Sequence, residues 1–362
     1  MKNNSQISNS KPHNFIRRFV IGVIVLLAAI ALLVICIDPF FHYHEPWFGL
    51  KAVLTDKEYQ CVGSLKNFDY DNLIVGSSVT ENNNNAWFDE AFGGKTIKAV
   101  RSYGGTADLC WLLDVAHEDH GLKNVYYNID PASLSSEATT TFEDTGCPMY
   151  LYDDNPFNDV EYLFNKDVLF EKIPYMIARS VTGYDEGESY NWWETKTFSE
   201  DSVLEHYVRP ADSGTALDEK TYEDNLEANI ALLTEEVSAH PETDYYFFFP
   251  PYSVLWWDDT IRCGELNTVL YDESQCMKAL LEYDNVRVYN FMAREDITTD
   301  LNNYMDTLHF TPEINHSIVG WLSDGTDELH SDEEVDAFIA QLREFADTVE
   351  TEEMPQYAAR LN

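Results

Sequence analysis

Leu73-Ile74-Val75-Gly76-Ser77-Ser78 is the stretch around which this chain is expected to fold. Its apolar residues end in a glycine and two serines, and polar residues follow within a few positions. This pattern predicts a buried strand that breaks into a turn. A serine between the end of a strand and the start of a helix is a common position for a nucleophile, so Ser78 is the first candidate site residue.

The sequence on either side of this stretch alternates between strand and helix patterns. Short apolar or β-prone runs predict strands at 72–76, 96–100, 124–129, 245–249 and 286–289. Apolar residues at helical spacing predict helices at 79–92, 106–117, 217–240, 269–282, 312–322 and 332–348. This alternation predicts an α/β domain over 69–350 with a parallel sheet, followed by a polar tail at 351–362.

Residues 131–217 interrupt the alternation and form a long insertion rich in polar and aromatic residues. Such a length is typical of a lid or a substrate-binding subdomain. The group Tyr190-Asn191-Trp192-Trp193 either stacks on sugars or forms the core of the insertion, and both interpretations stay open. We expect Trp192, Trp193 and Tyr252, which follows the fourth strand, to contact substrate.

Residues 19–37 form an apolar run without a charged side chain, and Arg17 and Arg18 precede it. The run is close to the roughly 20 residues that span a bilayer as a helix. The positive-inside rule predicts a single-pass plasma-membrane protein with 1–18 in the cytoplasm, 38–68 next to the membrane and the main domain outside. A cleaved signal peptide is the alternative, but the apolar run is long for a signal core.

The charge of the chain is strongly negative and unevenly placed. The net charge is −41, and all 64 acidic residues follow residue 37. Such a field repels nucleic acid and anionic surfaces, so no nucleic-acid partner is expected. A neutral glycan is a more compatible partner than a polyanionic polymer.

Cysteines and histidines offer weaker signals. In an oxidising compartment, Cys263 and Cys276 form the most plausible disulfide because they close a short loop. No C-x-x-C spacing occurs, so a thiolate zinc site is not expected. His117 and His120 are three residues apart and suit either a metal site or an exposed helix end. We favour the helix end and expect neither a metal nor a cofactor.

A second stretch, Asp306-Thr307-Leu308-His309, supplies the groups that a nucleophilic serine needs. A serine hydroxyl is a poor nucleophile until a base such as imidazole takes its proton. A carboxylate fixes the tautomer of that imidazole and stabilises its charged form. Asp306 and His309 are close enough in sequence for one turn to join their side chains, so we predict a catalytic triad of Ser78, His309 and Asp306.

These two stretches together resemble the SGNH (GDSL-like) hydrolase superfamily. Gly76-Ser77-Ser78 resembles its first sequence block, with Ser77 in place of the usual aspartate, and 306–309 resembles the last block. The Gly-Ser-Ser form resembles membrane-anchored branches that serve D-alanylation of teichoic acids and acetylation of exopolysaccharides. Tyr103-Gly104-Gly105-Thr106 resembles the second block, whereas Asn128-Ile129-Asp130-Pro131 departs from the Gly-x-Asn-Asp spacing of the third.

The resemblance implies a fold and a site. The fold is a three-layer, flavodoxin-like parallel sheet with flanking helices, behind one N-terminal transmembrane helix. The oxyanion hole consists of the amides of Ser78 and of Gly104 or Gly105, with Asn128 as a third donor.

The resemblance also implies an activity, that of an extracytoplasmic serine acyl-esterase or O-acyltransferase acting on a cell-surface glycan or polymer. A membrane-bound O-acyltransferase is the implied partner. The alternatives are a plain deacylating esterase and a catalytically inactive glycan-binding or scaffold protein of cell-envelope assembly.

Overall fold

The computed structural model of the protein describes residues 10–361, and within them six strands form one sheet in the order β2-β1-β3-β4-β5-β6. The strands are β1 (Asn72–Gly76), β2 (Thr96–Val100), β3 (Asn124–Asn128), β4 (Asp244–Phe249), β5 (Val286–Asn290) and β6 (Glu328–Leu329). The first five run parallel, as predicted, whereas β6 runs antiparallel to β5. The prediction of a purely parallel sheet is therefore wrong at this edge. A two-residue strand is too short to carry a periodic signal.

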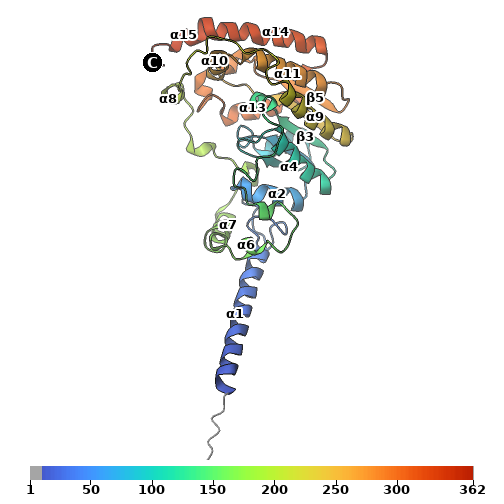
Figure 1. Ribbon diagram of the computed structural model, residues 1–362, viewed down its shortest axis with the longest axis vertical. Coiled ribbons are helices and arrows are strands. Elements are labelled where there is room, and N and C mark those ends of the chain that lie inside the picture. Colours follow the sequence, from blue (N-terminus) through green and yellow to red (C-terminus); the bar gives the residue numbers. More distant parts are fainter. Residues whose placement is uncertain (1–9, 362) are drawn as a thin grey trace, which may run out of the picture.

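Helices surround this sheet and connect its strands (Figure 1). The helices that accompany the sheet are α2 (Lys57–Asn67), α3 (Asn85–Phe92), α4 (Thr106–Asp119), α9 (Glu223–Ala239), α10 (Val254–Cys263), α11 (Leu266–Leu280), α12 (Glu295–Thr298), α13 (Pro312–Asp324) and α14 (Asp332–Thr348), with the short helix η5 (Leu301–Asn303). α3 packs beside α13, whereas α4 packs beside α2 and α9, and α9 packs beside α11.

Neighbouring side chains of β3 show that helices cover both faces of the sheet. Tyr126 packs against Phe88 and Phe92 of α3, with ring centroids 4.6 and 4.7 Å away. Tyr127, the next residue, lies against Cys110 of α4. Successive residues of a strand point to opposite faces, so α3 and α4 lie on opposite sides. This explains why the strands are apolar runs without alternation.

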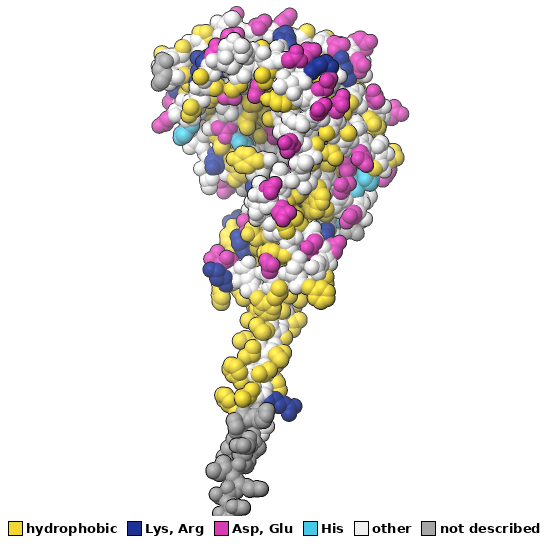
Figure 2. Space-filling model, viewed as in Figure 1, with side chains coloured by type: hydrophobic (Ala, Val, Ile, Leu, Met, Phe, Trp, Pro, Cys, Tyr) yellow, Lys and Arg dark blue, Asp and Glu magenta, His cyan; other side chains and the backbone are white. Residues whose placement is uncertain are grey.

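α1 (Ser10–Ile37) projects from the domain and leaves most of its described side chains exposed (Figures 1 and 2). Within the described residues, Asn14–Ile37 is the one helical segment long and apolar enough to cross a membrane. The helix begins earlier than the predicted apolar run. The first nine residues of the predicted cytoplasmic tail lie outside the described part of the chain.

The segment after α1 is tied to the α/β domain by hydrogen bonds and packing. Asp38 is buried, and its carboxylate accepts the backbone N–H groups of His42, Tyr43 and His44 and the hydroxyl of Tyr162. α2 lies within the predicted membrane-proximal segment 38–68, yet it packs against α4 and β2. Part of that segment is therefore built into the α/β domain.

The insertion at 131–217 is built from short helices. These are α5 (Pro131–Leu134), η1 (Met149–Leu151), α6 (Val160–Leu163), η2 (Val168–Lys172), α7 (Ile173–Thr182), η3 (Glu186–Glu188), η4 (Trp193–Thr195) and α8 (Glu200–His206). α6 contacts the end of α1, and nearby in the sequence the side chains of Phe157, Phe170 and Val181 are exposed. Apolar side chains continue from α1 onto the base of the domain, while acidic ones dominate further up (Figure 2).

The predicted polar tail and disulfide both differ from the structure. η6 (Val349–Glu353) and α15 (Met354–Tyr357) continue from α14 and pack against α10, with Met354 buried. All six cysteines lie within the described residues and have free thiols. The predicted Cys263–Cys276 disulfide is therefore wrong. Cys276 lies on α11 with its thiol fully buried in the core, whereas Cys263 ends α10 and is partly exposed.

Glu273, in α11, makes the stability of the domain depend on pH. Its side chain is fully buried and accepts a hydrogen bond from Asn290 Nδ2 at 2.8 Å. Burial raises the pKa of Glu273 to about 8, against the effect of the Asn290 bond. The folded chain therefore keeps this carboxyl protonated over a pH range in which the unfolded chain ionises it. Stability should fall as pH rises from about 4.5 to about 8.

Glu273→Gln removes this ionisation while it preserves the shape of the side chain. We expect its Tm, measured by circular dichroism, to rise relative to that of the wild type as the pH is raised from about 5 to about 8. A Tm difference that stays constant over this range would contradict the assignment.

Candidate active site

The three residues of the predicted triad, Ser78, His309 and Asp306, lie in one hydrogen-bonded chain. Ser78 Oγ lies 2.9 Å from His309 Nε2, although the two residues are 231 positions apart. His309 Nδ1 lies 2.7 Å from Asp306 Oδ2. With the Nδ1 proton donated to Asp306, Nε2 is free to accept the Ser78 hydroxyl proton. This arrangement can activate a serine as a nucleophile.

The loop that carries Asp306 and His309 is held in place by its own backbone. A bridge between Tyr304 and Phe310 closes it, and Asp306 Oδ1 accepts the N–H groups of Leu308 and His309 at 2.9 and 2.8 Å. Burial alone would raise the pKa of Asp306, but the bond and charge of His309 and the two amides outweigh it and lower that pKa. Asp306 is therefore held as a carboxylate against the imidazole.

Gly76 allows the turn that presents Ser78. A Cβ at this position would lie 2.2 Å from Thr80 Oγ1 and 3.0 Å from Asn128 Cβ. The Thr80 N–H donates to the Ser77 carbonyl at 3.0 Å, which closes the turn directly after β1. Any larger residue would push this turn away from β3, so the glycine is required by a close approach and not by its φ angle.

The backbone amides expected to form an oxyanion hole differ in availability. The Ser78 N–H makes no hydrogen bond within the described residues. The Gly104 N–H donates to the Arg101 carbonyl at 3.0 Å, whereas the Gly105 N–H reaches only Asp108 Oδ2 at 3.4 Å. Gly105 is thus the better donor of the two. The two loops leave neighbouring strands, because β1 pairs with β2.

Asn128 is the last residue of β3 and lies within the strand. Its side chain is 2% exposed, and its carboxamide oxygen has no hydrogen-bond partner among the described residues. It lies beside Gly76, at the carboxyl ends of the strands, where the turn that carries Ser78 begins. An amide in this position can serve as the third donor to an oxyanion.

Replacing Asn128 with alanine is expected to lower kcat for acyl transfer by about 10²–10³, because an oxyanion donor acts mainly in the transition state. KM should change little, and steady-state hydrolysis of an acyl ester measures both. Asn124→Ala is the matched control. Asn124 opens the same strand at its other end and bonds to Asn72. If the Asn128→Ala variant is as active as this control, Asn128 does not belong to the oxyanion hole.

Asp130 was not predicted as a site residue, yet it links two residues of the site. It accepts the Ser77 hydroxyl at 2.5 Å and the hydroxyl of Tyr252. Burial raises the pKa of Asp130, and the Ser77 bond opposes this shift. A carboxylate directly after the carboxyl end of a strand was the available signal, because ligands bind at that edge of parallel sheets.

Tyr252 was expected to contact substrate, but its side chain is 1% exposed. Its ring packs against Trp256 with centroids 5.5 Å apart. Any effect of Tyr252 on the reaction would therefore pass through Asp130. The buried ring offers no surface to a ligand in this conformation.

Trp192 lies against the imidazole of His309. The two rings meet edge to face, with centroids 5.1 Å apart and an interplanar angle of 81°. The indole N–H donates to Glu81 Oε2 at 2.9 Å, and Glu81 also accepts the Ser102 hydroxyl at 2.8 Å. The insertion therefore contributes a wall to the site. Trp193 begins η4 and is half-buried, and the described contacts do not join it to the triad.

Lys98, on β2, was also missed, although a lone lysine within an apolar strand was a visible signal. Its side chain is 1% exposed. The ammonium donates to the carbonyls of Glu81, Asn83 and Ser189 and to Asn191 Oδ1, at 2.5–2.8 Å. Burial lowers the pKa of Lys98. These oxygens nevertheless favour the ammonium form, because an ammonium donates three hydrogen bonds.

The contacts of Lys98 join the loop after Ser78 to the insertion. Most of the polar run at 81–85 is buried by this arrangement. Asn84 caps α3, since its side chain accepts the Ala86 N–H at the start of the helix.

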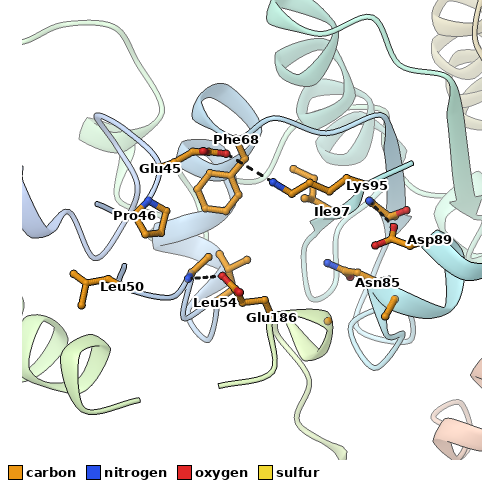
Figure 3. A pocket seen from close by; sticks show the side chains of 14 residues that line it. Glu45, Pro46, Leu50, Leu54, Phe68, Asn85, Asp89, Lys95, Ile97 and Glu186 are labelled. Carbon is orange, nitrogen blue, oxygen red and sulfur yellow. Dashed lines mark hydrogen bonds and ion pairs between the residues drawn. The ribbon is translucent and has the colours of Figure 1, made fainter. Parts of the chain in front are cut away.

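A separate cavity of about 380 Å³ lies between the segment after α1 and the start of β2 (Figure 3). Phe68 supplies part of its apolar wall, Glu45 pairs with Lys95 at 3.8 Å, and Glu186 accepts the Ala52 N–H at 2.9 Å. Its lining includes no member of the triad. It opens where β2 begins, whereas the triad lies beyond the other end of the strands.

Compared with known proteins, the chain matches no family model and no curated protein sequence. Any statement about its function therefore rests on the geometry around Ser78.

Proposed function

We propose that this protein is a membrane-anchored serine acyl-esterase or O-acyltransferase of the SGNH type, acting on a cell-surface glycan or polymer. The observation that carries the proposal is the hydrogen-bonded chain from Ser78 Oγ through His309 to Asp306. Nucleophilic acyl transfer requires a hydroxyl nucleophile, an imidazole base and a carboxylate that orients the base, each within hydrogen-bonding distance of the next.

In the proposed reaction, His309 Nε2 takes the proton of Ser78 as Oγ attacks the acyl carbonyl carbon. The intermediate collapses, and the departing alkoxide oxygen takes this proton from His309, which leaves the acyl group on Ser78. His309 then removes a proton from water or a sugar hydroxyl, whose oxygen attacks the acyl carbon. Ser78 Oγ leaves and recovers its proton.

The negative charge on the carbonyl oxygen needs donors during both attacks. The free N–H of Ser78, the weakly bonded N–H of Gly105 and the side-chain NH₂ group of Asn128 suit this role. Donors held in place before the reaction stabilise the intermediate without reorganisation.

The fold supports the same proposal. The first five strands have the order 2-1-3-4-5 of doubly wound, flavodoxin-like sheets, and α3 and α4 contact opposite faces. We propose that the helices complete a three-layer fold of SGNH type. In such sheets, ligands bind beyond the carboxyl ends of the strands, which is where β1 leads into Ser78.

We further propose that α1 spans the plasma membrane with its N-terminus in the cytoplasm, so that the site works outside. Arg17 and Arg18, directly before its apolar run, support this orientation. The donor or acceptor would then reach the site from the membrane surface, and a membrane-bound O-acyltransferase is a suitable partner. The acidic surface favours a neutral glycan over a polyanionic polymer.

Labelling with a fluorophosphonate probe tests the nucleophile. We expect the full chain in detergent to be labelled, and Ser78→Ala and His309→Ala to lose the label while their circular dichroism matches that of the wild type. If the wild-type protein is folded but is not labelled, the proposal that it is a serine enzyme is contradicted. Labelling of both variants at the wild-type rate would show that another residue reacts.

Transfer and hydrolysis are separated by supplying an acyl donor with and without a neutral glycan acceptor. Acyl groups recovered on the glycan, at the expense of free acid, support a transferase. Release to water alone, at the same rate with and without the glycan, would support the plain esterase.

A further inference from the structure

A second cluster of reactive side chains lies where helices α4 and α9 pack together. α4 carries His117, α9 carries Glu236, and His240 is the residue that caps the end of α9. One ligand atom from each of these three lies within 4.8 Å of the other two. Asp114, one turn before His117, lies next to Glu236. Two adjacent helices thus each present a carboxylate and an imidazole to the other.

Glu236 is the least satisfied member of this cluster. Its side chain is 7% exposed, and its Oε2 makes no hydrogen bond within the described residues. Glu236 and Asp114 bring two carboxyl groups together, and a bound cation would offset their repulsion and give Glu236 Oε2 a partner.

One ring nitrogen of His117 has a hydrogen-bond partner outside the cluster. The Tyr245 hydroxyl donates to the Glu236 carbonyl at 3.4 Å, so it can accept the Nε2–H of His117, which lies 3.1 Å away. His117 then carries its lone pair on Nδ1, and this type of outer contact orients metal-binding histidines. The His240 ring stacks parallel to the His117 ring, with centroids 3.5 Å apart, so one of the two rings has to turn about its Cβ–Cγ bond before both lone pairs point at one ion.

We propose that His117, His240 and Glu236, with Asp114 as the fourth ligand, form a binding site for a divalent transition-metal ion such as Zn²⁺. Two imidazole nitrogens and two carboxylate oxygens are a donor set that this ion accepts with four-coordinate geometry. Ca²⁺ and Mg²⁺ prefer six or more oxygen ligands, so they suit the site poorly. A cavity of about 440 Å³, lined in part by Asp114, His117 and His240, gives the ion a path from solvent.

The proposed metal ion would stabilise the folded chain and would take no part in the acyl-transfer reaction. α4 ends just before β3 begins, and α9 ends just before β4 begins. The cluster therefore lies at the amino ends of the parallel strands. Ser78 follows the carboxyl end of β1, so the triad lies at the opposite ends of the strands. An ion held there would clamp the ends of two helices and stabilise the folded chain by mass action.

Calorimetric titration of the full chain in detergent tests the site, after metals have been stripped with a chelator. We expect one equivalent of Zn²⁺ to bind per chain and to raise the Tm. His117→Ala and His240→Ala should lower the affinity by at least about 10–100-fold. His120→Ala is the matched control, because His120 ends the same helix but bonds to the Leu65 carbonyl. Its affinity for Zn²⁺ should equal that of the wild type.

Glu236→Gln separates loss of metal binding from loss of folding, because it preserves the shape of the side chain. We expect its circular dichroism to match that of the metal-free wild type, while Zn²⁺ no longer raises its Tm. The proposal is overturned if a folded Glu236→Gln variant binds Zn²⁺ as tightly as the wild type. It is also overturned if the wild type binds only several weak equivalents that all variants share, as a strongly acidic surface would.

Discussion

Ser78→Ala is expected to lower kcat for hydrolysis of a p-nitrophenyl acyl ester by on the order of 10⁶, and Asp306→Asn by on the order of 10⁴. The first change removes the attacking atom. The second keeps the shape of the side chain but replaces the acceptor of the His309 Nδ1 proton, 2.7 Å away, with a group that can hold the wrong tautomer. Steady-state kinetics on purified full-length protein measures both effects.

Ser77→Ala is the control that identifies which serine reacts. Ser77 is adjacent to Ser78, but its hydroxyl donates to Asp130 at 2.5 Å, away from the imidazole. We expect this variant to retain fluorophosphonate labelling and a kcat far above that of Ser78→Ala. A Ser77→Ala variant as inactive as Ser78→Ala would show that the hydrogen bond to Asp130 is as important as the triad.

Lys98→Met is expected to lower the free energy of unfolding by about 3–5 kcal/mol, because it leaves three buried carbonyls and an amide oxygen without their donor. These acceptors belong to the loop after Ser78 and to the insertion, so their separation should also move Trp192 away from His309. We expect labelling of Ser78 to slow by about 10–100-fold at temperatures where the variant is folded.

Lys166→Met is the matched control for this prediction, since the Lys166 side chain is 85% exposed. An exposed substitution of this type should change stability by no more than about 0.5 kcal/mol. Denaturant unfolding gives the free energies, and the labelling rate gives the effect on the site. If Lys98→Met unfolds and labels like Lys166→Met, the buried lysine does not connect the insertion to the active site.

Much of the candidate site was predictable because its signals are local in sequence. β1 ends in Gly76-Ser77-Ser78, and an apolar strand that stops at a glycine reveals where a side chain is presented. Asp306 and His309 are joined across a single turn, so their spacing predicts their contact. The apolar span within α1 is equally local, because its length and lack of charge depend on no other part of the chain.

The remaining features depend on contacts that local patterns do not encode. Lys98, Glu81 and Trp192 come from three distant segments, and their roles appear only when the insertion folds back onto β2. Tyr252 looked like a substrate contact because it follows a strand, yet packing buries it behind Asp130. Cys276 looked like a disulfide partner by spacing, but its helix turns the thiol into the core.

The sequence by itself therefore determined the elements: an apolar helix long enough to span a membrane, a sheet of alternating βα units, and the two short stretches that carry Ser78 and His309. Only the tertiary structure decided which side chains meet around the predicted triad. The physical reason is that hydrophobic periodicity and turn chemistry act over a few residues, whereas burial and hydrogen bonding join groups such as Lys98 and Ser189 across 91 positions. The same distinction applies to His117 and Glu236, which become a candidate metal site only when α4 and α9 pack.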